Sequence, residues 1–256
     1  MNVAINQPRL DLGDRPVGHA QLTNMSLALR TLMDCHHAGE SSPRMGLFYG
    51  YSGYGKSVAA AFAAARLAAA YVEAKSVWTQ RSILEAIATE LGIVKLERTT
   101  AKIFDQIVDL LNNEPRPIIV DEMDYLVKKS FVEIIRDIHD ATRVGIMMIG
   151  EEALPTKLKE WERFHNRILI ATPAMPASFE DACALRDHYC RRVDVADDLV
   201  MHIRDACKGV TRRIYVNLER VQRLAAEEGE EAVDLNWWGN RPVTTGDVPV
   251  RRLEAV

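Results

Sequence analysis

Residues 50–57 read Gly50-Tyr51-Ser52-Gly53-Tyr54-Gly55-Lys56-Ser57 and fit the pattern G-x-x-x-x-G-K-[ST] at every position. An apolar segment, residues 45–49, precedes this stretch, and an alanine-rich helix is expected from 58 to 71. A glycine-rich loop between a strand and a helix N-terminus can surround a phosphate with backbone N–H groups. The stretch is therefore predicted to bind a nucleoside triphosphate, with the Lys56 ammonium on the β- and γ-phosphates and the Ser57 hydroxyl on Mg²⁺.

A second apolar stretch, residues 117–120, ends in the acidic pair Asp121-Glu122. A carboxylate at the end of a buried strand beside a phosphate loop lies where Mg²⁺ and its water shell need one. Asp121 is predicted to hold the metal together with Ser57, and Glu122 to act as the catalytic base for the attacking water. Val-Asp-Glu favours a hydrolysing ATPase over a small-molecule kinase, and the sequence has no Asn-Lys-x-Asp motif for guanine, so ATP is the expected nucleotide.

The composition limits the classes of protein that fit. The chain has 256 residues, which is enough for one large α/β domain and a small satellite, and a formal net charge of −4. Any nucleic-acid contact must therefore use a local basic surface. The four cysteines form no C-x-x-C pair and indicate reduced thiols. No signal-peptide pattern or long apolar span is present, so the expected location is the cytoplasm, of a bacterium or a phage-infected host, with no membrane partner.

Five strand-like segments alternate with helical segments along the chain. The expected strands are 45–49, 71–74, 117–121, 145–149 and 168–170, and the expected helices are 23–39, 58–71, 80–92, 101–112, 131–138 and 154–163. This alternation predicts an α/β fold built on a doubly wound, five-stranded parallel sheet with flanking helices. Thr23 or Asn24 is expected to cap the first helix.

The strand pattern stops after Pro173 and Pro176, and the chain beyond these prolines is predicted to be helical. The expected division is an N-terminal arm (1–20), an α/β nucleotide-binding domain (21–176), a small helical subdomain (177–232) and an irregular C-terminal tail (233–256). Trp237 and Trp238 in the tail are expected either to dock a partner or to pack on their own domain.

Arginines recur at two places that matter for phosphate chemistry. Arg163 and Arg167 lie just before the fifth strand, and Arg212 lies in Gly209-Val210-Thr211-Arg212, at the start of the last helix. Hydrolysis develops negative charge on the γ-phosphate, and an arginine supplied by another subunit can stabilise that charge.

The order of these features over about residues 20–228 resembles that of the AAA+ P-loop ATPases, in which the helical subdomain is a lid. Three segments, 46–57, 118–124 and 146–152, are similar to the small transposition ATPases. That group includes the B protein of Mu-like transposable phages and the IstB and TniB types. The resemblance implies a protein that oligomerises with ATP on double-stranded DNA, as a ring or helical filament, and that activates or directs a transposase.

The resemblance also implies roles for the arginines and for one acidic residue. Arg167, or alternatively Arg163, would be the finger that reaches the nucleotide of a neighbouring subunit, and Arg212 would sense the γ-phosphate from the lid. Gly150-Glu151 stands where such ATPases carry a polar sensor, which implies slow turnover stimulated by DNA or a partner.

In such assemblies two segments are expected to face the DNA. They supply lysine and arginine for phosphates and threonine hydroxyls for register, without reading sequence. The candidates are Lys75, Trp78 and Arg81 in the first segment and Lys95, Arg98, Thr99, Thr100 and Lys102 in the second, with Lys128 and Lys129 as weaker ones.

Other functions stay open from the sequence. A helicase loader of the DnaC/IstB kind is the main alternative to a transposition ATPase. A scaffold in which ATP only permits oligomerisation, and an ATPase of secretion or signalling, are the others. DNA-stimulated hydrolysis distinguishes the leading prediction from the last of these.

Overall fold

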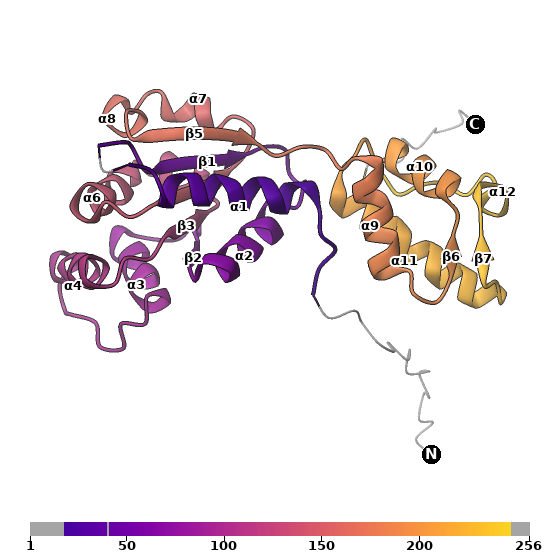
Figure 1. Cartoon of the computed structure of the whole chain (residues 1–256), viewed down its shortest axis with the longest axis horizontal. Helices are drawn as coiled ribbons and strands as arrows, with labels where there is room; N and C mark the ends of the chain where they lie inside the picture. Colours follow the sequence, from indigo (N-terminus) through magenta and orange to yellow (C-terminus); the bar gives the residue numbers. More distant parts are fainter. Residues whose placement is uncertain (1–17, 40, 247–256) are drawn as a thin grey trace, which may run out of the picture.

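The computed structural model of the protein describes residues 18–39 and 41–246, so the predictions for 1–17 and 247–256 lie outside the described residues. A five-stranded parallel sheet with the strand order β2-β3-β4-β1-β5 forms the centre of the larger part of the molecule (Figure 1). Its strands are β1 (Met45–Tyr49), β2 (Ala70–Glu73), β3 (Ile118–Asp121), β4 (Ile146–Gly150) and β5 (Ile168–Pro173). The predicted α/β fold with a five-stranded parallel sheet is confirmed.

Helices cover both faces of this sheet. They are α1 (Thr23–His36), α2 (Lys56–Leu67), α3 (Gln80–Glu90), α4 (Thr100–Asn113), α5 (Asp124–Lys128), α6 (Val132–Thr142), α7 (Leu154–Leu158) and α8 (Glu162–His165). On β1, Phe48 belongs to the apolar cluster under α1 and α2, whereas Leu47 belongs to the cluster under the helices of the opposite face. Both faces of the central strands β1, β3 and β4 are buried, which is why these strands read as continuous apolar runs.

The parallel arrangement brings the predicted site residues to one edge of the sheet. Tyr49, the residue before the phosphate loop, is in register with Gly150 at the end of β4. Glu73 is in register with Asp121 at the end of β3. Strands that run in one direction end at the same edge, so loop and carboxylates meet there although they lie far apart in the sequence.

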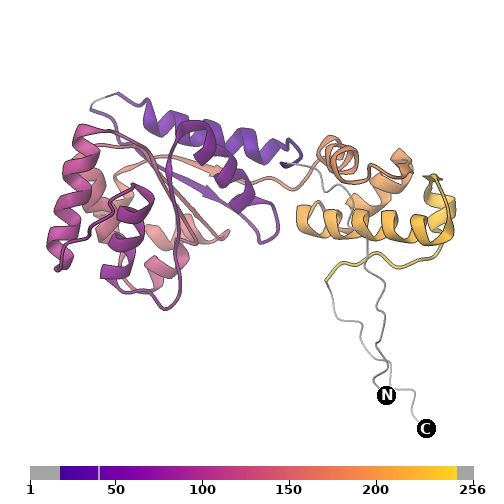
Figure 2. The ribbon, with the colours of Figure 1, turned by 90° about the horizontal axis from the view of Figure 1, so that it is seen from below.

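The chain then enters a smaller unit with its own apolar core, seen at one end of the molecule in Figures 1 and 2. Its elements are α9 (Phe179–Tyr189), β6 (Asp194–Val195), α10 (Asp197–Ala206), α11 (Thr211–Glu228), β7 (Ala232–Val233) and α12 (Leu235–Trp238). We call residues 177–246 the lid. The sequence predicted only helices here, but β6 and β7 pair in parallel. Strands of two residues are too short to show a period in the sequence.

The expectation of an irregular tail from residue 233 is also wrong for the residues described. Val233 and Trp238 are buried in the core of the lid, and the Asp234 side chain caps α12 by accepting a hydrogen bond from the Trp237 N–H. Asn217, wholly buried on α11, exchanges two hydrogen bonds with the Thr244 backbone and so holds the chain after α12. Of the two interpretations left open for Trp238, packing on its own domain is the one observed.

Several helix boundaries differ from prediction because tertiary contacts override local signals. Leu22, rather than Thr23 or Asn24, is the N-cap residue of α1. The expected helix 154–163 is interrupted between α7 and α8, and α5 was not predicted. Helix α2 ends at Leu67, before Tyr71, which lies in β2.

Replacing Trp238 by alanine is expected to lower the free energy of unfolding by about 3–5 kcal/mol, the usual cost of truncating a fully buried aromatic side chain. Trp238→Phe should cost less, because it leaves a smaller cavity and removes an indole N–H that has no hydrogen-bond acceptor in the described structure. Urea unfolding followed by circular dichroism measures both. Trp237→Ala, at the half-buried neighbouring residue, is the control. An equal loss from Trp237→Ala and Trp238→Ala would contradict this packing.

Candidate nucleotide site

The phosphate loop has the backbone conformation that its glycines predict. Gly53 and Gly55 have φ angles of 85° and 79°, in the left-handed region that side chains disfavour. A Cβ atom at Gly53 would lie 2.8 Å from Cγ1 of Val210 in the lid, so the loop and the lid approach closely only because this residue is glycine. The Lys56 ammonium donates to the carbonyls of Gly50 at 2.7 Å and Tyr51 at 2.9 Å, which closes the loop around the start of α2.

Lys56 stands among carboxylates at this edge of the sheet. Burial lowers the pKa of Lys56, and four neighbouring acidic groups oppose that shift: Asp121, Glu122, Asp124 and Glu151. Lys157 pairs with Asp124 at 2.6 Å and with Glu151 at 3.4 Å, which leaves Lys56 as the ammonium for Asp121 and Glu122. Beside these two carboxylates a triphosphate calls for a cation in addition to Lys56.

Asp121 is buried and accepts hydrogen bonds on both carboxylate oxygens. It is 2% exposed, and its Oδ1 accepts the Glu122 N–H at 2.7 Å while its Oδ2 accepts the Tyr71 hydroxyl at 2.8 Å. Burial, followed by the Asp121 charge, raises the pKa of Tyr71, and a hydrogen bond with the Ser57 side chain opposes the shift. Tyr71 thus joins the two predicted metal ligands, a role that the sequence did not reveal because Tyr71 falls at a boundary between helix and strand.

The residues present fit a divalent cation bound together with a nucleotide. Among the described residues, no group of three or more His, Cys, Asp and Glu side chains is arranged to hold a metal ion. Mg²⁺ at Asp121 would therefore also need the Ser57 hydroxyl, water and phosphate oxygens, which is how Mg²⁺ usually binds in nucleotide sites.

Glu122 has two properties of a catalytic base. Its φ angle is 54°, in the left-handed region, and such strain persists in a folded protein only where the surroundings impose it. Burial and then the Asp121 charge raise the pKa of Glu122, while Lys56 acts in the opposite direction. A raised pKa makes a carboxylate a stronger base, which suits it to accept a proton from water.

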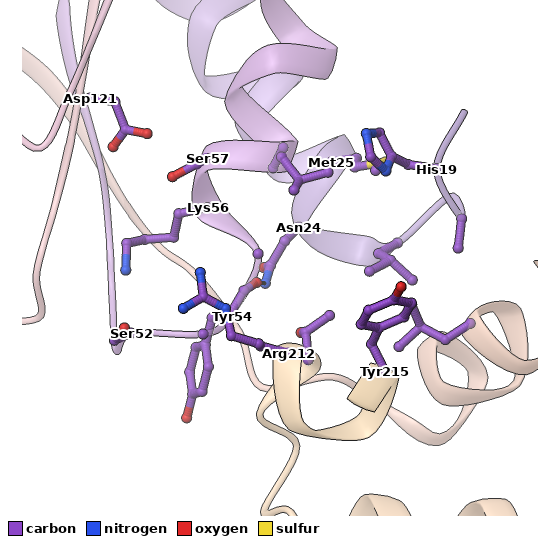
Figure 3. A pocket seen from close by; sticks show the side chains of 18 of the residues that line it. His19, Asn24, Met25, Ser52, Tyr54, Lys56, Ser57, Asp121, Arg212 and Tyr215 are labelled. Atoms are coloured by element: carbon purple, nitrogen blue, oxygen red, sulfur yellow. Dashed lines mark hydrogen bonds between the residues drawn. The ribbon is translucent and has the colours of Figure 1, made fainter. Parts of the chain in front are cut away.

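The loop forms one side of a cavity of about 460 Å³ that runs from the sheet edge to the lid. Its lining includes Lys56, Ser57, Asp121 and Glu122, and at the far end a set of apolar and aromatic side chains: His19, Leu22, Met25, Leu185, Tyr189 and Tyr215. In Figure 3, Arg212 and Lys56 point into the same part of the cavity, and Tyr215 lies towards His19. The polar end suits phosphates and the aromatic end suits a nucleobase.

Hydrogen bonds join the lid and the chain leading into it to the elements on the other side of this cavity. The Arg212 backbone N–H donates to the Gly53 carbonyl at 3.0 Å. The buried Asn24 side chain donates to the carbonyls of Tyr54 and Met175, both at 2.8 Å, and accepts the Met175 N–H. Asn24, one of the two residues expected to cap α1, instead links the phosphate loop to the chain that enters the lid. The sequence carried no signal for these contacts, because their partners are far apart along the chain.

The other predicted arginines lie elsewhere. The Arg167 carbonyl accepts the N–H of Met45, the first residue of β1, so Arg167 lies at the edge where the strands begin. The phosphate loop follows the end of β1, which is 5 residues long, or about 16 Å at ~3.3 Å per residue. Arg163 and Arg167 are not among the residues that line the nucleotide cavity. They are therefore not brought together with the phosphate loop of their own chain.

The predicted DNA-binding residues fall on two neighbouring loops and on the first turns of α3 and α4, which follow these loops. Some of the side chains are exposed and others are held by contacts. Lys75, Lys95, Arg98 and Lys102 are exposed. Trp78 packs against the core of the α/β domain, and the Thr99 side chain caps α4 by accepting the Lys102 N–H. Arg81 pairs with Glu85 at 2.6 Å and donates to the Arg98 carbonyl, which ties the two loops together, and Thr100 is the first residue of α4.

Fold and site together are those of a P-loop ATPase. Residues 38–158 match the AAA domain family. No curated protein matches the sequence. Within the described residues, every helix is too short or too polar to cross a membrane.

Solved structures with the same fold include proteins that act on DNA. The ORC2 protein of Aeropyrum pernix, solved in ADPNP and ADP complexes, has 17% identity and a TM-score of 0.67, with 89% of this chain and 68% of that chain covered. The ORC1 protein of Aeropyrum pernix, solved in complex with DNA, has 20% identity and a TM-score of 0.59, with 86% and 63% covered. The RuvB Holliday junction branch migration motor of Thermotoga maritima has 17% identity and a TM-score of 0.58, with 87% and 70% covered. At such identities the likeness establishes the fold alone.

Proposed function

We propose that this ATPase binds ATP with Mg²⁺, assembles on double-stranded DNA without reading its sequence, and directs or activates a transposase. DNA is favoured by two proteins of the same fold, an ORC1 protein solved in complex with DNA and a branch migration motor. The transposase is favoured by the resemblance of residues 46–57, 118–124 and 146–152 to the transposition ATPases.

Each polar residue of the nucleotide cavity has a separate role in hydrolysis. Lys56 and the backbone of the phosphate loop hold the phosphates, and Arg212 approaches them from the lid. Asp121 and Ser57 hold Mg²⁺, which neutralises charge on the phosphate oxygens when bound. Glu122 takes the proton from the attacking water. The aromatic end of the cavity, with Tyr189 and Tyr215, holds the base.

The proposal that subunits assemble rests on one observation, the position of Arg167. It lies at the strand edge opposite to the phosphate loop of its own chain, so it can reach a γ-phosphate only on another subunit. Such a site is complete only when subunits stack head to tail, and head-to-tail contacts generate rings or helical filaments. DNA that binds several subunits at once favours the same arrangement.

The DNA surface of the proposal is made by the loops 74–79 and 92–99. The second loop is held by the Gln106 side chain, which donates to the Lys95 carbonyl and accepts the Glu97 N–H, both at 3.0 Å. A loop fixed in this way presents Arg98 in one geometry, with Lys75 and Lys102 exposed beside it. These side chains suit phosphates, and phosphate binding positions a protein on a duplex but carries no sequence information.

Binding to a long, unrelated linear duplex tests the proposal, measured by co-sedimentation with ATP, with ADP and without nucleotide. We expect cooperative binding only with ATP. The triple variant Lys75→Ala, Arg98→Ala, Lys102→Ala should weaken it and reduce the slope of log K against log salt by about one for each phosphate that the variant no longer neutralises. A triple variant of exposed cations elsewhere, Lys159→Ala, Arg191→Ala, Arg223→Ala, is the matched control.

Absence of DNA binding with every nucleotide would contradict the proposal and favour a partner-remodelling ATPase. If binding occurs, stimulation of a purified transposase is the next measurement. A helicase loader would instead bind a replicative helicase and leave the transposase unaffected.

A further inference from the structure

A three-residue cluster lies at the edge where the strands begin, away from the nucleotide cavity. His139 and Asp140 are neighbours near the end of α6, and Arg167 precedes β5. Arg167 donates from Nε to Asp140 Oδ1 at 3.1 Å and from Nη2 to Asp140 Oδ2 at 2.9 Å. His139 Nδ1 lies 3.0 Å from Asp140 Oδ1. One carboxylate therefore receives hydrogen bonds from both a histidine and an arginine.

The way in which Arg167 is held leaves one end of its guanidinium group available. A guanidinium has five N–H groups. Two of them form the side-on pair with Asp140, and a third, on Nη1, donates to the Arg163 carbonyl at 3.1 Å. The other two N–H groups, one on each terminal nitrogen, have no acceptor in the described part of the chain, and the Arg167 side chain is 36% exposed. The one on Nη2 belongs to the end-on edge of the guanidinium, the edge that faces a phosphate oxygen in an arginine–phosphate pair.

His139 determines how Asp140 is held. The histidine is wholly buried, and burial lowers its pKa, so the imidazole is neutral and carries one proton. Its Nε2 is buried without a hydrogen-bond partner among the described residues. A proton on Nε2 would leave that N–H unpaired and turn a lone pair of Nδ1 towards the carboxylate. The proton therefore lies on Nδ1 and is donated to Asp140. Although burial opposes it, hydrogen bonds from Arg167 and His139 lower the pKa of Asp140.

We propose that Asp140, itself held by His139, is a positioning residue that aims Arg167 at the γ-phosphate of the neighbouring subunit. This inference rests on the proposed role of Arg167 as a finger acting on another subunit. Arginine has four rotatable side-chain bonds, and the side-on pair removes that freedom before subunits meet. The ion pair does not compete with the nucleotide, because it uses the side-on fork and leaves the end-on N–H of Nη2 for phosphate.

The experiment compares Asp140→Ala, Asp140→Asn and Arg167→Ala in the ATPase assembled on DNA. Asp140→Ala should lower kcat about 10- to 100-fold, as expected for a misplaced catalytic group, with KM for ATP unchanged. Asp140→Asn keeps one acceptor for the guanidinium and should lie between Asp140→Ala and the unmodified protein. Asp137→Ala is the matched control, because Asp137 lies on the same helix, accepts a 2.7 Å hydrogen bond from Arg136 and does not contact Arg167. It should leave kcat unchanged.

Mixing subunits separates positioning from a folding defect. Glu122→Gln subunits have an intact Arg167 but a damaged nucleotide site, and Asp140→Ala subunits have the reverse. A mixture of Glu122→Gln and Asp140→Ala subunits should recover activity that neither has alone. A mixture of Glu122→Gln and Arg167→Ala subunits should do the same. If Arg167→Ala lowers kcat and Asp140→Ala does not, or if Asp140→Ala is not rescued by mixing, the inference is wrong. If Arg167→Ala itself has no effect, the proposed finger is wrong and the inference fails with it.

Discussion

Replacing Lys56 by alanine is expected to abolish both ATP binding and ATP-dependent assembly on DNA. The Lys56 ammonium is the positive charge that the phosphate loop places within the acidic cluster of Asp121, Glu122, Asp124 and Glu151. Asp124 and Glu151 stay paired with Lys157, but without Lys56 the triphosphate meets Asp121 and Glu122 and loses hydrogen bonds between charged groups worth about 1.5–3 kcal/mol each. We expect the affinity for ATP to fall at least about 100-fold, since 1.4 kcal/mol is about tenfold. Titration with a fluorescent ATP analogue measures it.

Two controls show that the loss comes from the phosphate site. Lys56→Ala removes only two hydrogen bonds to loop carbonyls, so its circular dichroism spectrum and melting temperature should stay near those of the unmodified protein. Lys159→Ala removes an exposed lysine outside the nucleotide cavity and should bind ATP normally. Normal assembly of Lys56→Ala on DNA with ATP would contradict the assignment of the site.

Glu122→Gln is expected to lower kcat about 100- to 10,000-fold, the usual contribution of a general base, and to leave ATP affinity nearly unchanged. Glutamine keeps the shape of the side chain but cannot accept the proton of the attacking water. Assemblies on DNA should then persist, because the hydrolysis that releases them is blocked. Single-turnover hydrolysis and the rate of dissociation from DNA measure the two effects. If the variant functions and leaves DNA at the normal rate, ATP serves only as a switch for assembly.

The pH dependence of hydrolysis gives an independent check on Glu122. The carboxylate must be ionised to act as a base, and burial together with Asp121 raises its pKa above the ordinary value of 4.5. As pH falls, kcat/KM should therefore begin to decrease at a higher pH than an ordinary glutamate would give. The residual rate of Glu122→Gln should be flat over that range. The same acid limb in Glu122→Gln would assign the titration to another group.

The sequence alone was enough to predict the features that depend on neighbouring residues. Residues 50–57 specify a phosphate loop because the glycines, the lysine and the serine act within one turn of chain. Strand β1 was predicted with its observed bounds, and β3 within one residue, because fully buried parallel strands read as apolar runs. That Asp121-Glu122 would lie beside the loop followed from the rule that parallel strands end at one edge.

Contacts between distant segments were decided only by the tertiary structure. Tyr71 on Asp121, Asn24 on Met175, and Tyr215 in the cavity with His19 bring together residues that no local pattern relates. Thr23 illustrates the reason: its N–H and hydroxyl both donate to Asp181, a partner in the lid, and so it does not cap its helix. The ion pair between Arg167 and Asp140 is also decided by the tertiary structure, because an aspartate on α6 and an arginine before β5 meet only after the sheet has formed. Sequence patterns report the local energetics of strands, loops and helices, whereas these side chains are positioned by packing across the whole chain.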